Sequence, residues 1–220
     1  KFIVDVDKSA QLPAGVFDAI DDSNRVVIIA SSTRDGEEEK VLTAFKQVLE
    51  SHPNTMLLLV PRHPERFDAV ATLVGRMGFR LGRRSKNDLL TDQMQVYLGD
   101  SMGEMMSYYR LASIAFVGGS LVNTGCQNVL EPAAFGIPVV TGPSQFNFAT
   151  ICRQLEAESA LRTVANEKEL ADFLIDLIPD WARQAEMGRR GKALVEDNQD
   201  SLPALLSLLE PLMAAPSSDA

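Results

Sequence analysis

The chain has 220 residues, of which 45% are hydrophobic and 23% are charged, and its mean hydropathy is -0.02. This composition is that of a folded globular protein and excludes a chain that is disordered as a whole. The net charge of -9 argues against a nucleic-acid-binding protein, because a phosphate backbone requires a basic protein face.

Short, unbroken apolar runs alternate with helical patterns along the chain. Unbroken runs are typical of strands that are covered on both faces of a parallel sheet. In the first half of the chain they predict strands at residues 26–30, 56–60, 79–81 and 95–98. Helical periodicity predicts helices at residues 37–51, 65–77 and 103–112.

The second half continues the same alternation. It predicts a strand at residues 114–117, a glycine-rich loop at 118–125, a helix at 128–135 and a strand at 137–140. From residue 147 onward we expect helices, with one short strand near 161–164. Sequential strand-helix units with short connections imply right-handed crossovers, and therefore an α/β fold with a Rossmann-like, doubly wound parallel sheet.

A single domain over residues 23–213 accounts for this pattern. We expect residues 1–22 to be a connector from an N-terminal domain that is missing from the sequence, because the chain starts at Lys1 rather than Met. Residues 214–220 predict a disordered tail. The two cysteines, Cys126 and Cys152, are too few for a disulfide framework, and no apolar run reaches the roughly 18 to 20 residues of a membrane-spanning helix. We therefore expect reduced thiols and no membrane span.

Ligands of open parallel sheets bind beyond the carboxyl ends of the strands, and this rule selects four loops. The first, residues 31–34, carries three hydroxyls and a cation, which suit an anionic ligand. Thr33 or Asp35 can instead cap the helix that follows, with the glutamates at 37–39 near its positive end. Capping accounts for Asp35 and the glutamates, so only residues 31–34 are candidates for function.

The second loop places Arg62 between prolines, directly after a strand. A rigidly held guanidinium can bind a phosphate through two hydrogen bonds, although Arg62 in a surface turn can equally pair with a carboxylate. The third loop, residues 99–105, is a tight turn whose amides can read the edge of a base. The alternative there is an ordinary capped helix, with Asp100 or Ser101 as the cap and Glu104 in its first turn.

The fourth loop follows a strand with paired glycines, Gly118 and Gly119. Such glycines let the main chain approach a ligand closely, and the next helix points its amides toward the same place, so a phosphate is stabilised there. Asn128 and Glu131 have the spacing of a capping box. Pro132 disfavours helical geometry at Glu131, which favours a carboxylate that is free to bind ribose hydroxyls. The GxGxxG fingerprint of NAD enzymes is absent.

Four ordered motifs together resemble the 3-deoxy-D-manno-octulosonic acid (Kdo) transferase family. They are Ala30-Ser31-Ser32-Thr33, Pro61-Arg62-His63-Pro64-Glu65-Arg66, Gly99-Asp100-Ser101-Met102-Gly103-Glu104, and Gly118-Gly119-Ser120 through Asn128-Val129-Leu130-Glu131-Pro132-Ala133. The resemblance covers nearly the whole chain and corresponds to the C-terminal half of that family's two-domain GT-B architecture. It implies the donor-binding domain of an inverting glycosyltransferase, which transfers Kdo from CMP-Kdo to the lipid A precursor in lipopolysaccharide biosynthesis.

The resemblance also implies roles for individual residues. Arg62 meets the phosphate, the turn at Met102 and Gly103 meets the cytosine, and Glu131 holds the ribose hydroxyls. The full set of expected CMP-sugar-binding residues is Ser32, Thr33, Arg62, Met102, Gly103, Glu104, Gly118, Gly119, Ser120, Asn128 and Glu131. We expect no metal ligand and no cofactor other than the donor substrate CMP-Kdo.

The sequence departs from the family pattern at three positions. The family usually has His where this chain has Arg34 and Gln127, and often Gly where it has Cys126. Gln127 cannot titrate near neutral pH, so it cannot serve a proton-transfer role. The family's general base belongs to its N-terminal domain. We therefore expect no catalytic residue in this chain, weak binding of CMP and no transfer by these residues alone.

Partners and alternatives follow from the same reasoning. The intact protein is expected at the cytoplasmic face of the bacterial inner membrane, with CMP-Kdo and the lipid A precursor as partners and no nucleic acid. A basic district at residues 62–86 suits a small anionic ligand or anionic lipid, although a solvated surface also explains it. Two alternatives remain: the nucleotide-binding half of a UDP-sugar-dependent GT-B transferase or epimerase, and a non-enzymatic nucleotide-binding module.

Overall fold

The structure of the chain, a computed structural model, describes residues 25–91 and 93–213, with side chains described up to residue 198. The expected connector at residues 1–22 and the expected tail at residues 214–220 lie outside the described residues. None of the helices in the described part of the chain combines the length and hydropathy that a bilayer crossing requires.

Seven parallel strands form one sheet in the order β3-β4-β2-β1-β5-β6-β7. Their bounds are β1 Val26–Thr33, β2 Thr55–Pro61, β3 Leu81–Arg83, β4 Val96–Leu98, β5 Ile114–Val117, β6 Val139–Thr141 and β7 Leu161–Thr163. The chain starts in the middle at β1, builds one edge and then returns to build the other from β5 onward. This order confirms the predicted doubly wound sheet, with its topological switch point between β1 and β5.

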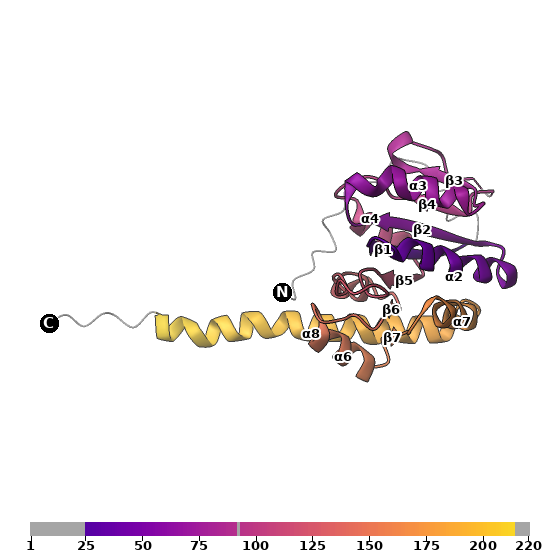
Figure 1. The fold of residues 1–220 in the computed structure, drawn as a ribbon. Coiled ribbons are helices and arrows are strands. Elements are labelled where there is room, and N and C mark those ends of the chain that lie inside the picture. Colours follow the sequence, from indigo (N-terminus) through magenta and orange to yellow (C-terminus); the bar gives the residue numbers. More distant parts are fainter. Residues whose placement is uncertain (1–24, 92, 214–220) are drawn as a thin grey trace.

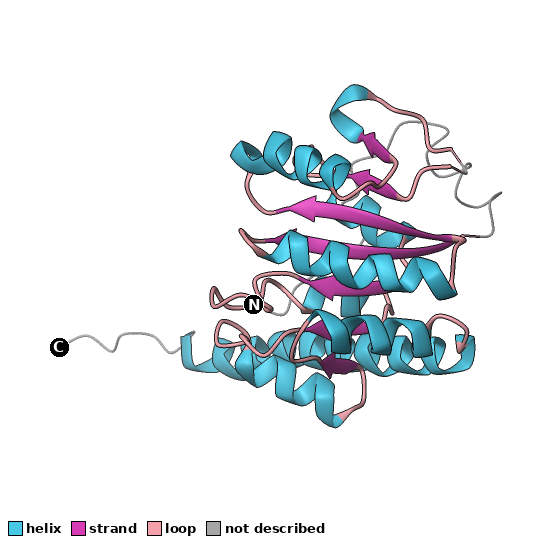
Figure 2. Ribbon diagram, turned by 45° about the vertical axis from the view of Figure 1, so that its right-hand side comes forward, coloured by secondary structure: helices cyan, strands magenta, loops and turns pink. Residues whose placement is uncertain are grey.

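Helices cover both faces of this sheet (Figure 2). One face carries α2 Glu37–Ser51, α3 Phe67–Arg76 and α7 Glu167–Leu177, whose apolar side chains pack with those of β1 and β2. The other carries α4 Met105–Leu111, α5 Leu130–Ala134, α6 Ala149–Ala157 and α8 Trp181–Met213. Figure 1 shows α8 continuing well beyond the sheet toward the C-terminus. Short 3-10 turns, η1 Pro64–Arg66 and η2 Arg84–Lys86, complete the elements.

The central strands explain why their apolar runs are unbroken. Val27 pairs with Met56 and Ile28 pairs with Leu57 in the β1–β2 register, and all four side chains are buried. Val27 and Met56 belong to the core beneath α4, whereas Ile28 and Leu57 belong to the core beneath α2. Because each face is covered by helices, both sets of alternating positions must be apolar.

The structure shifts several predicted boundaries. β1 extends to Thr33, so three residues that we expected in a loop belong to the strand, with a register shift between Ser31 and Thr33. The predicted strand at residues 79–81 lies at Leu81–Arg83 instead, because Phe79 is used in the core, where its ring lies 5.9 Å from that of Phe45. The predicted helix at residues 65–77 divides into η1 and α3.

The two cysteines are free thiols, as predicted. Both are buried in the core between α5, α6 and the sheet, and their sulfur atoms lie 3.8 Å apart. Cys126 therefore projects toward α6 and does not line the cavity at the carboxyl ends of the strands that is described below.

Candidate functional site

A cavity of about 270 Å³ lies where β1, β2, β4 and β5 end. Its lining comes from all four loops that the sequence selected: Ser32, Val60, Pro61, Arg62, Ser101, Met102, Gly103, Met105, Met106, Tyr109, Gln127, Asn128 and Glu131. Six of the expected binding residues are in this lining, namely Ser32, Arg62, Met102, Gly103, Asn128 and Glu131. The topology therefore brings segments that are far apart in sequence to one edge of the sheet.

Arg62 and Glu131 supply the opposite charges of the cavity. Arg62 is exposed and forms no ion pair with any of the carboxylates that the structure describes, so its guanidinium is available to a ligand. The Glu131 carboxyl is half-buried, and burial raises its pKa above the ordinary value, although the hydrogen bond from Asn128 and the charge of Arg62 oppose this shift. A cation and a desolvated carboxylate thus share one small cavity.

The capping box that the spacing of Asn128 and Glu131 allows as an alternative is not formed. Val129 occupies the cap position of α5 without a side-chain cap. Asn128 Nδ2 instead donates to Glu131 Oε1 at 2.9 Å, and Asn128 Oδ1 accepts from the Leu130 amide at 3.1 Å. Asn128 therefore orients the Glu131 carboxylate, and one carboxylate oxygen remains for hydroxyl groups of a ligand.

The third loop presents a turn to the cavity. Ser101, Met102 and Gly103 line it, and the Met102 side chain is 64% exposed. Gly103 has a φ of 82°, and an added Cβ there would meet nothing within 4 Å. The glycine is therefore required by its backbone conformation, not by close packing.

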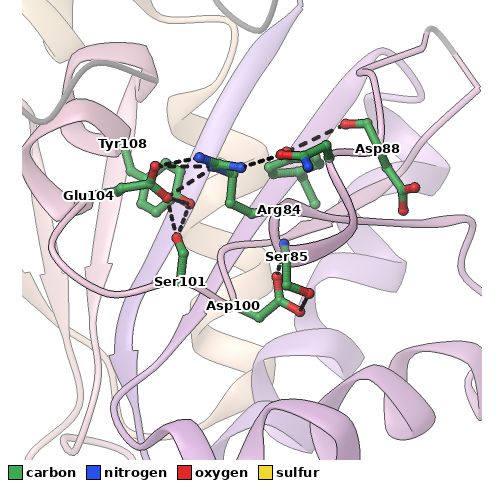
Figure 3. Close-up of polar contacts among 9 residues, drawn as sticks. Arg84, Ser85, Asp88, Asp100, Ser101, Glu104 and Tyr108 are labelled. Atoms are coloured by element: carbon green, nitrogen blue, oxygen red, sulfur yellow. Dashed lines mark hydrogen bonds and ion pairs between the residues drawn. The ribbon is translucent and has the colours of Figure 1, made fainter. Parts of the chain in front are cut away.

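The alternative of an α4 capped by Asp100 or Ser101 is not observed. Glu104 itself occupies the cap position, and no side chain caps the helix. The Asp100 carboxylate instead accepts hydrogen bonds from Arg83 and Ser85. Glu104 does not line the cavity; its carboxylate pairs with Arg84 (Figure 3).

The glycine-rich loop has a different arrangement from the one its sequence indicated. The fully buried Glu37 carboxylate accepts hydrogen bonds from the amides of Gly119 at 2.6 Å, Ser120 at 3.0 Å and Leu121 at 2.9 Å. The Ser120 hydroxyl is also engaged, because it donates to the Val117 carbonyl and accepts from the Gly142 amide. The amides that we expected to face a phosphate are thus held by a carboxylate of the chain itself.

The paired glycines are explained by close packing of the backbone. A Cβ on Gly118 would lie 2.6 Å from both the Ser32 carbonyl oxygen and Thr33 Cα. Gly119 has a φ of 78°, and a Cβ there would collide with the Gly125 carbonyl oxygen. Gly118, Gly119, Ser120, Thr33 and Glu104 do not line the cavity, so their role in ligand binding stays a prediction.

The first loop corrects the expectation that Thr33 or Asp35 caps α2. The cap position is held by Gly36, with a φ of 75° and no side-chain cap. Thr33 is buried, and its hydroxyl donates to Glu38 Oε1 at 2.8 Å. Glu38 is itself buried and bonded to the Arg66 guanidinium through both oxygens, at 2.6 and 2.8 Å.

Sequence analysis missed Glu37 and Glu38 as buried groups. Glutamates in the first turn of a helix are usually solvated and favourable to the helix dipole, so their pattern carries no signal of burial. The basic district at residues 62–86, which holds seven arginines and lysines, partly indicated that buried carboxylates need positive partners. Three of its arginines, Arg66, Arg83 and Arg84, point at the carboxylates of Glu38, Asp100 and Glu104 respectively.

The remaining departures from the family pattern take separate positions. Gln127 lines the cavity, and its side-chain amide donates to the Gly125 carbonyl at 3.4 Å. The Arg34 guanidinium contacts His63 Nε2, which must act as the acceptor because an arginine only donates. Arg34 is not among the residues that line the cavity, whereas Arg62 is.

A larger cavity, of about 550 Å³, lies along the edge strand β7. Its lining includes Arg183 and Arg190, whose charges are paired with Asp176 and Glu186. None of the four loops that the sequence selected contributes to it. The smaller cavity is therefore the better candidate site. Among the described residues, no three His, Cys, Asp or Glu side chains are grouped as metal ligands.

Comparisons with known proteins identify the family of the chain. The family model of glycosyl transferases group 1 matches residues 17–194. The 3-deoxy-D-manno-octulosonic acid transferase of Haemophilus influenzae is 43% identical over 191 residues, and that of Bordetella pertussis is 34% identical over 193 residues. Each alignment covers 86% of this chain and 45% of the relative, so the chain spans less than half the length of these relatives.

Solved structures resemble the chain in the same way. The crystal structure of the C-terminal CMP-Kdo binding domain of WaaA from Acinetobacter baumannii has a TM-score of 0.73 and 33% identity, covering 80% of this chain and 98% of that one. The C-terminal domain of LpcC from Francisella tularensis, with a TM-score of 0.58 and 16% identity, shows the same fold. The chain therefore belongs to the group 1 glycosyltransferases, as a C-terminal domain of the Kdo transferase family with the GT-B fold.

Proposed function

We propose that this chain is the donor-binding domain of an inverting glycosyltransferase, which transfers Kdo from CMP-Kdo to the lipid A precursor in lipopolysaccharide biosynthesis. The observation that carries the proposal is the cavity at the four strand ends, where Arg62 and Glu131 meet the turn at Met102 and Gly103. The CMP-Kdo binding named for the A. baumannii domain supports the choice of donor.

Each part of CMP has a matching group in the cavity. The Arg62 guanidinium suits the phosphate, because its planar fork donates two hydrogen bonds to a phosphate. The Glu131 carboxylate, oriented by Asn128, accepts from the ribose hydroxyls. The turn at Met102 and Gly103 offers backbone groups and the Met102 side chain to the cytosine ring.

This arrangement also assists the departure of the leaving group. When the bond between Kdo and the phosphate breaks, negative charge develops on the phosphate of CMP. A positive group held nearby stabilises that charge in the transition state. Arg62 is the residue placed to do so, because its guanidinium is exposed at the cavity and unpaired among the described residues.

The acceptor and the general base are assigned to the part of the relatives that this chain does not cover. The lipid A precursor and the cytoplasmic face of the inner membrane are therefore features proposed for the intact protein. For these 220 residues alone we propose binding of CMP without transfer. Turnover of CMP-Kdo by this chain by itself would contradict that assignment.

Calorimetric titration with CMP, UDP and CTP tests the proposal, on the wild type and on Glu131→Ala. We expect CMP to bind more tightly than UDP, and Glu131→Ala to weaken CMP about 10-fold, because hydrogen bonds to a charged group contribute about 1.5 to 3 kcal/mol. Glu158→Ala, at an exposed position after α6, is the matched control and leaves the affinity unchanged.

Two other outcomes identify the alternatives. Binding of UDP at least as tight as that of CMP would indicate a UDP-sugar-dependent transferase or epimerase. Equally weak binding of all three nucleotides, unchanged in Glu131→Ala, would contradict a nucleotide-sugar site and indicate a non-enzymatic module.

A further inference from the structure

The turn at the cavity is held from behind by an ion pair. Arg84 lies in η2, and its Nε donates to both carboxylate oxygens of Glu104, at 3.1 and 3.0 Å. Arg84 Nη2 donates to Glu104 Oε1 at 2.8 Å, while Nη1 donates to Asn87 Oδ1 at 2.8 Å. The guanidinium is thus fixed in its plane by two partners, and it holds the carboxylate in one orientation.

The same carboxylate closes the turn on itself. The Ser101 hydroxyl donates to Glu104 Oε2, which joins the first and last residues of the turn. The buried Tyr108 hydroxyl donates to the same oxygen at 3.1 Å, from the first turns of α4. Figure 3 shows Arg84 and Ser101 approaching the Glu104 carboxylate from different sides. Ser101, Met102 and Gly103 line the cavity on one side of Glu104, and Met105 and Met106 of α4 line it on the other, whereas Glu104 itself does not.

A second ion pair fixes the start of the turn. Arg83 Nε donates to Asp100 Oδ2 at 2.7 Å, and the Ser85 amide and hydroxyl both donate to the Asp100 carboxylate. Two adjacent arginines, in β3 and η2, therefore anchor the residues on either side of Ser101, Met102 and Gly103. The sheet edge at β3 serves as a rigid support for a turn that has no strand or helix geometry of its own.

The chemistry of this pair favours a geometric role over a purely stabilising one. Glu104 is only 8% exposed, and a buried ion pair usually gives no more stability than apolar side chains of similar size. What the bidentate pair adds is a fixed direction, which an apolar contact lacks. A site that must match a flat ring with backbone atoms depends on that direction.

We propose that Arg84 and Glu104 are positioning residues, which hold the turn at Met102 and Gly103 in the shape that receives the nucleotide base. The inference rests on the proposed function and assigns base recognition to a support outside the cavity. Neither side chain lines the cavity, so we expect each to act through the backbone of the turn.

The test compares Arg84→Met and Arg84→Lys with Arg76→Met as the matched control. Arg76 is exposed at the C-terminal end of α3. Because α3 connects the parallel strands β2 and β3, this end lies at the amino ends of the strands, whereas the turn follows the carboxyl end of β4. The Arg76 variant therefore removes the same charge without touching the turn. Calorimetry measures the dissociation constants of CMP and of ribose 5-phosphate, which lacks the base.

We expect Arg84→Met to raise the dissociation constant of CMP about 10-fold, the equivalent of one charge-assisted hydrogen bond, and to leave that of ribose 5-phosphate unchanged. Arg84→Lys keeps the charge but not the bidentate geometry, and we expect it to recover part of the affinity. Arg76→Met leaves both constants unchanged. Unchanged CMP binding in Arg84→Met, or equal weakening of both ligands, would overturn the inference.

A measurement without ligand keeps the inference separate from the proposed function. In heteronuclear NMR spectra of the free protein, we expect the amide resonances of Met102 and Gly103 to move in Arg84→Met and to stay in place in Arg76→Met. A wild type that binds no CMP while these resonances respond as expected would contradict the proposed function only. Amide resonances of Met102 and Gly103 that stay in place in Arg84→Met would contradict the proposal that Arg84 positions the turn.

Discussion

Two loops at the same edge of the sheet are each fixed by a buried carboxylate, but in opposite ways. In the glycine-rich loop, Glu37 accepts hydrogen bonds from three consecutive main-chain amides. In the third loop, Glu104 is held by the Arg84 guanidinium and by hydroxyl groups, and the neighbouring residues Ser101, Met102 and Gly103 line the cavity. The Glu37 carboxylate thus binds main-chain amides of its loop, whereas the Glu104 carboxylate binds side chains.

The comparison shows that a glycine-rich loop before a helix is not by itself an anion site. Its amides bind a phosphate only when no group of the protein has already taken them. Here the negative charge of Glu37 stands where the pattern predicts a phosphate, and Arg62 is the exposed cation at the cavity. Because their supporting carboxylates have different partners, we expect the two loops to differ in ligand binding.

The largest effect is expected from Glu37→Gln. A glutamine keeps the volume but turns an amide nitrogen toward N–H groups that need an acceptor, and each buried unsatisfied group costs about 1 to 3 kcal/mol. We expect a loss of about 2 to 4 kcal/mol in the free energy of unfolding, measured in urea. Glu39→Gln, on the exposed side of the same helix turn, changes stability by less than about 0.5 kcal/mol. Similar stability of the two variants would show that Glu37 does not anchor the loop.

Arg62→Ala decides which loop receives the phosphate. If Arg62 meets it, the substitution weakens binding of CMP by about 1.5 to 3 kcal/mol, the contribution of hydrogen bonds to a charged group. Isothermal titration measures the change, and Arg76→Ala controls for the loss of one positive charge. An unaltered dissociation constant would return the phosphate to the glycine-rich loop and remove Arg62 from the site.

Two glycine substitutions contrast packing with backbone conformation. Gly118→Ala places a methyl group 2.6 Å from backbone atoms of β1, so we expect a stability loss of about 1 to 3 kcal/mol from overpacking. Gly103→Ala meets no neighbour but carries a positive φ, which costs about 1 kcal/mol and changes the turn. Urea unfolding and CMP titration of both variants check that Gly118 affects mainly stability, whereas Gly103 affects mainly binding. A reversed pattern would exchange the roles that we assign to the two loops.

The smallest effect is a dependence on pH. Burial by itself would raise the pKa of Glu104, but hydrogen bonds from Arg84, Ser101 and Tyr108 and the charge of Arg84 bring it below the ordinary value of 4.5. The folded state therefore binds this proton less readily than the unfolded state, and the resulting stability is present above pH 4.5 and is lost as the pH falls through the lowered pKa.

Unfolding of the wild type and of Glu104→Gln, measured between pH 3 and pH 7, tests this dependence. We expect the stability difference between them to shrink as the pH falls. Burial raises the pKa of Glu37, against the hydrogen bonds from its amide donors. The folded state then binds this proton more readily, so the stability that Glu37 contributes relative to Glu37→Gln should grow as the pH falls. Parallel slopes for the two variants would contradict the contrast between the carboxylates.

The order of apolar runs was enough to determine the parallel sheet and the loops at its carboxyl edge. A strand that helices cover on both faces must be apolar throughout, so the sequence predicts β1, β2 and β5 from their unbroken apolar runs. The loops that follow them must then meet at one edge, which is why Arg62, Gly103 and Glu131 could be placed in one cavity from the sequence.

Only the tertiary structure decided which polar groups form hydrogen bonds within the protein and which remain available to a ligand. Glu37 and Gly119 are 82 positions apart, and Arg84 and Glu104 are 20 apart, so no local pattern connects them. A glutamate in a first helical turn and an arginine on a surface have the same sequence appearance whether they are solvated or buried as partners. Whether such a side chain is solvated or paired depends on contacts with residues that are distant in the sequence, because a buried charge requires a hydrogen-bonding or charged partner.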